Sequence, residues 1–252
     1  MVRTPPSRCR PWGDVVSRPL IILDIGSTLV DGPAHGPASR IAAVAGLTTF
    51  QKRELHHLLM TVDFAGPAGV VAAARDRLGL SGAALESAVH EVWAAQEAEG
   101  QLIPGAMEAL EFFAGYECQL ALLSNIWSAY LMATWRLLGD FFSAHIPPEL
   151  QMFSCREGLT KPNPELLAQL LKRADRHPEE ALIVGDSYKN DIAPAIGCGV
   201  RTLWLLHSPQ QERSALVSIL NGQAAAPTLT LPALAGLDFD QFSNSVLSQV
   251  FA

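Results

Sequence analysis

The sequence predicts an α/β fold built on a parallel sheet, and three short apolar runs carry this prediction. They lie at residues 20–23, 119–123 and 181–184, and turn-forming residues or helical patterns separate them. Continuous apolar runs of this length are typical of strands buried on both faces of a parallel sheet. Strands that alternate with helical segments favour the α/β class.

The first of these strands ends in a single carboxylate. Pro19 precedes the run 20–23, and Asp24 follows it just before Gly26 and Ser27. In open α/β sheets, ligands bind at the carboxyl ends of the strands, so Asp24 is a candidate for chemistry. Aspartate is also a common turn former, and this residue alone does not separate the two interpretations.

The sequence predicts that residues 38–100 form a helical insert between the strand 20–23 and the later α/β elements. Val71, Ala74 and Leu78 follow helical spacing, and residues 66–67 and 79–82 supply the breaks between helices. We expect no strand in this span. Pro104 then reopens the α/β pattern, with a helix over 106–114 before the strand at 119–123.

Further polar residues follow the later strands. Ser124 ends the strand 119–123, where it can cap the next helix, contribute to an anion site, or do both. Lys161 stands just before a predicted helix over 165–174, where the helix dipole does not favour positive charge, so we expect another partner for it. The remaining prediction is a strand at 201–206, a helix at 209–220, a strand at 228–231 and a closing helix at 241–251.

Two carboxylates, Asp186 and Asp191, lie five residues apart in the loop after the strand 181–184. If they converge on one point they repel each other, and a divalent cation removes that repulsion. The alternative is that both are solvated turn or cap residues.

Composition limits the classes of function. The chain has 252 residues, 49% of them hydrophobic, which is ample for a real core. Its net charge of −7 is spread along the chain and argues against nucleic-acid binding. No apolar stretch is long enough to span a membrane, and residues 1–18 are expected to be a flexible basic, Pro-rich extension. Four scattered cysteines without a CxxC pair favour a reducing, cytoplasmic setting.

The order of these polar residues resembles the haloacid dehalogenase superfamily over residues 20–206. Lys161-Pro162-Asn163-Pro164 and Gly185-Asp186-Ser187 are similar to that family's third and fourth motifs. The resemblance implies a Rossmann-like three-layer α/β/α core with a parallel sheet, formed by residues 19–35 and 101–252. It also implies that residues 36–100 are an inserted all-helical cap that closes over the site.

The resemblance implies a Mg²⁺-dependent phosphatase that acts on a small phosphorylated molecule, with no nucleic-acid or membrane partner. Asp24 would attack phosphorus to give an aspartyl phosphate, and Lys161 would add positive charge beside it. The implied Mg²⁺ ligands are Asp24, the backbone carbonyl of Gly26 and Asp186; Ser124, Asn125 and Lys161 would hold the phosphoryl group, and Asp191 would support the site.

One residue departs from the family pattern. Family phosphatases carry a second aspartate two residues after the nucleophile, as general acid and base, and this chain has Gly26 there. Such catalysis contributes roughly 10²–10⁴-fold, so alkyl phosphates should react slowly. Aryl or acyl phosphates need no acid. The candidates for a substitute acid are Asp31 and His35, and in the helical insert His56, His57 and His90.

Three other functions stay open. A dehalogenase-like hydrolase fits the residue at position 26 and Ser124-Asn125 but needs no metal, so Gly185-Asp186 counts against it. A phosphonate-cleaving hydrolase would need Lys52, the single lysine of the insert, for a Schiff base. The third is a catalytically weak member of the family that binds a phosphorylated ligand or a partner.

Overall fold

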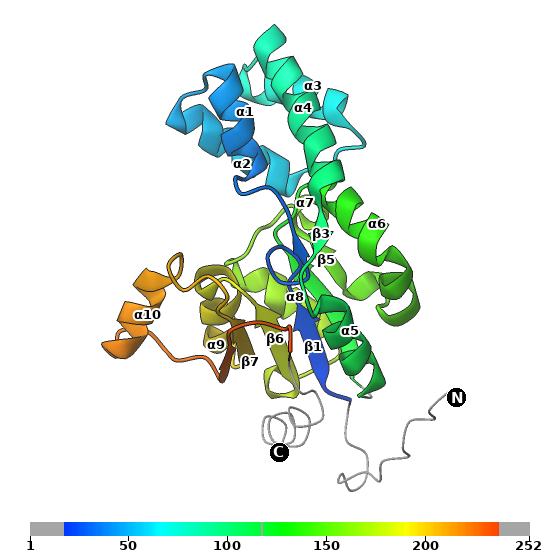
Figure 1. Ribbon diagram of the computed structural model, residues 1–252, viewed down its shortest axis with the longest axis vertical. Coiled ribbons are helices and arrows are strands. Elements are labelled where there is room, and N and C mark those ends of the chain that lie inside the picture. The colour runs from blue at the N-terminus through cyan, green and yellow to red at the C-terminus, as the bar shows by residue number, and fades with distance from the viewer. Residues whose placement is uncertain (1–17, 117, 237–252) are drawn as a thin grey trace, which may run out of the picture.

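A six-stranded sheet forms the centre of the computed structural model, which describes residues 18–116 and 118–236 (Figure 1). Its strand order is β5-β4-β1-β6-β7-β8, and every neighbouring pair is parallel. The strands are β1 (Leu20–Leu23), β4 (Gln119–Ser124), β5 (Gln151–Phe153), β6 (Ala181–Gly185), β7 (Arg201–Leu205) and β8 (Leu229–Leu231). The predicted α/β class with a parallel sheet is therefore confirmed.

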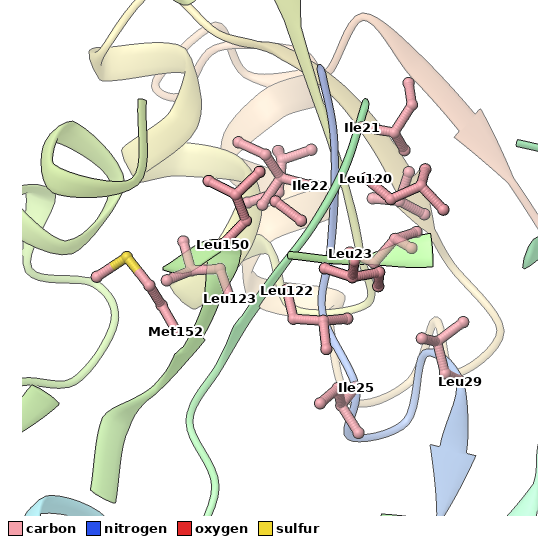
Figure 2. Close-up of a cluster of buried hydrophobic side chains, with 14 of the residues drawn as sticks. Ile21, Ile22, Leu23, Ile25, Leu29, Leu120, Leu122, Leu123, Leu150 and Met152 are labelled. Carbon is pink, nitrogen blue, oxygen red and sulfur yellow. The ribbon is translucent and has the colours of Figure 1, made fainter. Parts of the chain in front are cut away.

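The first strand lies in the middle of the sheet, hydrogen-bonded to β4 on one side and β6 on the other. Ile22 pairs with Ala121 and with Ile183. All four residues of β1 are at most 1% exposed, and Figure 2 shows apolar side chains packed on both of its faces. Burial on both faces explains why the sequence of β1 is a continuous apolar run without polar alternation.

Helices cover both faces of the sheet. They are α5 (Ala106–Gly115), α6 (Ser128–His145), α8 (Pro164–Ala174) and α9 (Ala193–Gly197). The connections through α5 and α6 lead from β1 to β4 and then to β5, toward one edge of the sheet. Those through α8 and α9 lead to β6 and then to β7, toward the other edge. Because such crossovers are right-handed, the two pairs lie on opposite faces and give three layers. The direction reverses between β1 and β6, which is where ligands bind in open α/β sheets.

Four helices between β1 and α5 form a separate group at one end of the molecule, which we call the four-helix unit (residues 37–99; Figure 1). They are α1 (Pro37–Ala45), α2 (Thr49–Thr61), α3 (Pro67–Leu78) and α4 (Ala83–Glu99). The expected helical insert without strands is confirmed. A short antiparallel ribbon of β2 (Val30–Asp31) and β3 (Gln101–Leu102) joins its two ends, and strands of two residues have no periodicity that could predict them.

The four-helix unit has its own apolar core, and the first turn of α6 enters it. Trp127 is 1% exposed and packs edge-on against Trp93 of α4, with ring centroids 5.3 Å apart. The Trp127 indole N–H also donates to Gln96 Oε1 at 3.1 Å. Ser128 donates to Asp63 at 2.9 Å and accepts from the Phe64 backbone at 2.8 Å. The unit is thus bonded to the sheet domain beside the end of β4.

The remaining described elements differ partly from expectation. The strand β5 was not predicted, because its three residues have no extended apolar run. The helix expected from residue 209 begins at Arg213, since the Gln211 backbone closes a turn onto the Ser208 carbonyl at 3.0 Å. Residues 1–17 and the helix predicted at 241–251 lie outside the described residues. The other elements are η1 (Pro148–Leu150), α7 (Ser154–Glu157), η2 (Pro178–Glu180), η3 (Tyr188–Ile192) and α10 (Arg213–Leu220).

Among the helices of residues 18–116 and 118–236, none has both the length and the apolar character required to cross a bilayer.

Candidate active site

Asp24 lies at the carboxyl end of β1, where the direction of the sheet connections reverses. Its backbone N–H continues the ladder to the Val184 carbonyl at 3.0 Å, which fixes the backbone that carries the carboxylate. The side chain is buried, and Thr28 donates a long hydrogen bond of 3.4 Å to Oδ2. A carboxylate held inside the protein in this way requires a positive partner.

Lys161 supplies that partner. Its Nζ donates to Asp24 Oδ1 at 2.5 Å, to Asp191 Oδ1 at 2.6 Å and to the Leu123 carbonyl at 2.9 Å. Burial disfavours the ammonium form, but the two carboxylates outweigh burial and raise the pKa of Lys161 above its ordinary value. Lys161 therefore stays charged. Its three acceptors are the partners expected for it from the sequence, because the start of a helix does not stabilise a positive charge.

Asn125 fixes the backbone of Lys161. The Asn125 amide nitrogen donates to the Lys161 carbonyl at 2.9 Å, and its oxygen accepts from the Lys161 N–H at 2.7 Å. These two bonds tie the end of β4 to the segment before α8. The family resemblance implied that Asn125 holds the phosphoryl group. In the structure, both the nitrogen and the oxygen of its side-chain amide are bonded to the backbone of Lys161.

Asp186 and Asp191 come from the loop after β6 and converge on Asp24. One carboxylate oxygen of each of the three residues lies within 4.8 Å of those of the other two. Gly185 permits this approach, because a Cβ there would lie only 2.5 Å from Asp191 Cγ. Asp191 Oδ2 also accepts the Ser187 N–H at 3.0 Å. The sequence interpretation in which both carboxylates point into solvent does not describe this arrangement.

The grouping of these carboxylates has an electrostatic cost. Burial, followed by the charges of Asp24 and Asp191, raises the pKa of Asp186 to about 8. Burial likewise raises the pKa of Asp191. Lys161 brings one positive charge to three carboxylates, so the cluster has an excess of negative charge. Three oxygen donors this close together, with charge left to neutralise, fit a hard divalent cation such as Mg²⁺.

Ser124 lies at the end of β4 and is 2% exposed, yet its hydroxyl has no hydrogen-bond partner among the residues that the structure describes. The expectation that it caps the next helix is wrong: α6 begins at Ser128, and its N-cap position is Trp127. Buried hydroxyl groups are nearly always bonded in folded proteins. An unsatisfied hydroxyl here is the partner that an oxyanion ligand would take.

Among the described residues, the convergent carboxylates are those of Asp24, Asp186 and Asp191, and none of the candidate substitute acids belongs to this set. All five are exposed, and within the described chain no hydrogen bond or ion pair joins any of them to Asp24: Asp31, His35, His56, His57 and His90. Lys52 lies on α2 and, with Ser39 and His56, lines an open groove of about 510 Å³ within the four-helix unit.

The structure adds Tyr130 of α6, which sequence reasoning missed. Burial raises the pKa of the Tyr130 phenol, and the charges of Asp24, Asp31 and Asp186 raise it further. Its hydroxyl donates to the Val30 carbonyl at 2.7 Å. No local signal could have identified it, because the contact joins a helix face to a turn one hundred residues earlier.

The fold and the cluster define a Rossmann-like α/β protein with a lysine and three carboxylates at the switch point of its sheet. The family model for haloacid dehalogenase-like hydrolases matches residues 19–199, which is more than half of the chain. The chain therefore belongs to this family of hydrolases.

Two relatives of known activity match parts of the chain. Glyceraldehyde 3-phosphate phosphatase from Pyrococcus furiosus is 37% identical over 75 residues, 30% of this chain and 29% of that protein. Ribulose-1,5-bisphosphate 5-phosphatase from Halopiger xanaduensis is 30% identical over 128 residues, half of each chain. The matches thus span no more than half the length of either relative.

Solved structures share the fold at low identity. A 2-haloacid dehalogenase from Pseudomonas syringae pv. tomato is 18% identical and covers 92% of this chain and 99% of its own, with a TM-score of 0.57. A haloacid dehalogenase family enzyme from Bacteroides thetaiotaomicron, solved with magnesium and inorganic phosphate, is also 18% identical. It covers 74% of this chain and 93% of its own, with a TM-score of 0.51.

Proposed function

We propose that this chain is a Mg²⁺-dependent phosphatase that acts on a small phosphorylated molecule through an aspartyl phosphate at Asp24. The observation that carries the proposal is the position of Asp24, whose Oδ1 is bonded to the buried Lys161, while carboxylate oxygens of Asp186 and Asp191 lie within 4.8 Å of an Asp24 oxygen. Both matched relatives are named as phosphatases of small phosphorylated molecules, which supports this choice.

Asp24 is the nucleophile in this proposal. Its carboxylate oxygen bonds to phosphorus as the bond from phosphorus to the leaving oxygen breaks, and water later hydrolyses the aspartyl phosphate. The charge of Lys161 stabilises negative charge on the phosphoryl oxygens. Ser124 donates its unbonded hydroxyl to one of those oxygens. Asn125 acts indirectly, because it holds the backbone of Lys161 in place.

Mg²⁺ would be held by Asp24, the backbone carbonyl of Gly26 and Asp186, and would supply positive charge to the phosphoryl group when bound. Asp191 supports this set. Its two oxygens are bonded to Lys161 and to the Ser187 backbone, so it orients the lysine and the loop that carries Asp186.

The four-helix unit, together with the residue at each of its ends, is the cap of the proposed enzyme and spans residues 36–100. The core of the proposed enzyme consists of residues 19–35 and the described chain after residue 100. Bonds of Ser128 to Asp63 and to the Phe64 backbone hold the cap next to the end of β4. A helical unit anchored there excludes water from the site and contacts the part of the substrate beyond the phosphate.

Gly26 limits the substrates. Without a side chain at this position, no carboxyl group is available there to protonate the leaving oxygen. The proposed substrates are accordingly those whose leaving groups depart without a proton, such as aryl or acyl phosphates.

The first test is hydrolysis of 4-nitrophenyl phosphate with Mg²⁺ by the wild type and by Asp24→Asn. Because the nucleophile is removed, we expect a loss on the order of 10⁴-fold or more in kcat. The matched control is Asp140→Asn, which removes an exposed aspartate near the end of α6 and should retain full activity.

Four outcomes would contradict the proposal. Equal activity of wild type and Asp24→Asn would exclude Asp24 as the nucleophile. Halide release from a 2-haloacid in the presence of a chelator would indicate a dehalogenase instead. Phosphonoacetaldehyde cleavage that disappears in Lys52→Ala would indicate the phosphonate-cleaving reaction, and phosphate binding without any turnover would indicate a ligand-binding protein.

A further inference from the structure

Tyr130 links α6 to the turn that follows Asp24. Its hydroxyl donates to the Val30 carbonyl at 2.7 Å, and the Ser27 backbone N–H donates to the same carbonyl at 2.9 Å. The Val30 N–H in turn donates to the Ile25 carbonyl at 3.0 Å, which closes the turn. The shape of this turn, which presents the Gly26 backbone beside Asp24, therefore depends on a bond from α6.

The ring of Tyr130 fits between two glycines. A Cβ at Gly26 would lie 3.5 Å from Cε1 of the ring and 3.9 Å from its hydroxyl oxygen. A Cβ at Gly32 would lie 3.6 Å from Cζ and 3.7 Å from Cε2, on the opposite edge. A Cβ at Gly26 would therefore be in ordinary contact with the ring, whereas a Cβ at Gly32 would also meet Gln96 Nε2 at 3.0 Å.

We propose that Tyr130 is a positioning and specificity-determining residue of the site, whose ring borders the space that a side chain at position 26 would enter. This inference rests on the function proposed above. Position 26 is where family phosphatases carry the acid for the leaving group, so the ring of Tyr130 limits what can be accommodated on that side of Asp24. Its hydroxyl fixes the turn from which the Gly26 carbonyl is presented.

The distances separate small from larger substitutions at position 26. A methyl group at 3.5 Å from the ring is in ordinary van der Waals contact, so alanine fits. The carboxyl group of an aspartate extends one bond further, so the ring restricts the directions in which it can point. Gly26→Asp alone should therefore fail to place an acid where the leaving group departs, and removal of the ring should allow it.

The kinetic test compares glycerol 3-phosphate, an alkyl phosphate, with 4-nitrophenyl phosphate as substrates. We expect Gly26→Asp to change the alkyl-to-aryl ratio of kcat/KM by less than about 3-fold, because the ring blocks the acid. Gly26→Asp with Tyr130→Ala should raise that ratio by at least about 10-fold. Gly26→Asp with Tyr130→Phe, which keeps the ring, should behave like Gly26→Asp alone. An equal gain in Gly26→Asp with and without the ring would overturn the proposal.

A second test needs no turnover and separates this inference from the proposed function. Gly26→Leu should lower Tm by at least about 3 °C more in the wild-type background than in a Tyr130→Ala background, because leucine collides with the ring. The control is Met132→Ala, an exposed residue of the same helix, whose effect should add to that of Gly26→Leu. If Tyr130→Ala is additive as well, the ring does not occupy this space and the inference fails, whether or not Asp24 catalyses hydrolysis.

Discussion

Two groups of residues beside Asp24 differ in how fully their polar groups are bonded. In the bonded group, Lys161 makes three short contacts and Asn125 fixes its backbone from both ends of an amide. In the open group, Ser124 and Gly26, the Ser124 hydroxyl is buried without a partner among the described residues and Gly26 has no side chain. Folding alone satisfies the polar groups of the first group. The second keeps one unbonded donor, the Ser124 hydroxyl, which is available to a ligand.

Lys161→Met is the most severe test of the bonded group, Lys161 and Asn125. This variant leaves Asp24 and Asp191 buried without their shared cation, and removal of one partner from a buried ion pair typically costs about 3–5 kcal/mol. We expect a loss of this size in the free energy of unfolding, measured by urea denaturation without metal. Lys172→Met, an exposed lysine on α8, is the control and should change stability little. Equal stability of both variants would mean that the contacts of Lys161 contribute nothing to folding.

Asp186 is one of the proposed ligands of the metal. Asp186→Asn removes one of three convergent carboxylates, and we expect the Mg²⁺ dissociation constant, measured by calorimetry, to rise by about 10-fold or more. Glu149→Gln, which removes an exposed carboxylate before β5, is the control. An unchanged titration would remove Asp186 from the metal site.

The raised pKa of Asp186 also predicts how stability depends on pH. Without metal, the folded protein keeps the Asp186 proton up to about pH 8, whereas the unfolded chain releases it near the ordinary value of 3.8. The folded state therefore binds more protons between these values, and this group makes stability fall as pH rises through the window. Thermal unfolding in a chelator should show a higher Tm at pH 6 than above pH 8, and Asp186→Asn should reduce the difference. A steeper dependence in the variant would contradict this assignment.

The smallest effect on stability is expected for Ser124, in the open group. Ser124→Ala removes a hydroxyl that has no partner, so the free energy of unfolding should change by less than about 0.5 kcal/mol. Ser154→Ala is the contrast, because the Ser154 hydroxyl bonds both backbone groups of Ile126 and its loss should cost about 1–3 kcal/mol. Affinity of Ser124→Ala for inorganic phosphate with Mg²⁺ should nevertheless fall about 10-fold or more. Loss of stability without loss of phosphate affinity would assign Ser124 to the core.

The position of the candidate site could be predicted from the sequence for a simple geometric reason. Asp24, Ser124 and Asp186 each follow an apolar run, and the carboxyl ends of parallel strands meet at one edge of a sheet. Lys161 was predicted to need a partner because the start of a helix does not favour its charge, but that rule does not name the partner.

Other parts of the site depend on contacts that no local pattern encodes. The role of Asn125 comes from bonds to a backbone thirty-six residues away, and Tyr130 reaches Val30 across one hundred residues. The capping role expected for Ser124 failed because the chain runs on through Trp127 before α6 begins. The short strand β5 has too few residues to show any periodicity.

The shared first turn of α6 has a consequence for modularity. Trp127 belongs to the apolar core of the four-helix unit although it follows β4 by only three residues. Excision of residues 37–99 would leave this indole uncovered, so the sheet domain is not a free-standing module. An exchange of this unit for another one therefore has to replace the beginning of α6 at the same time.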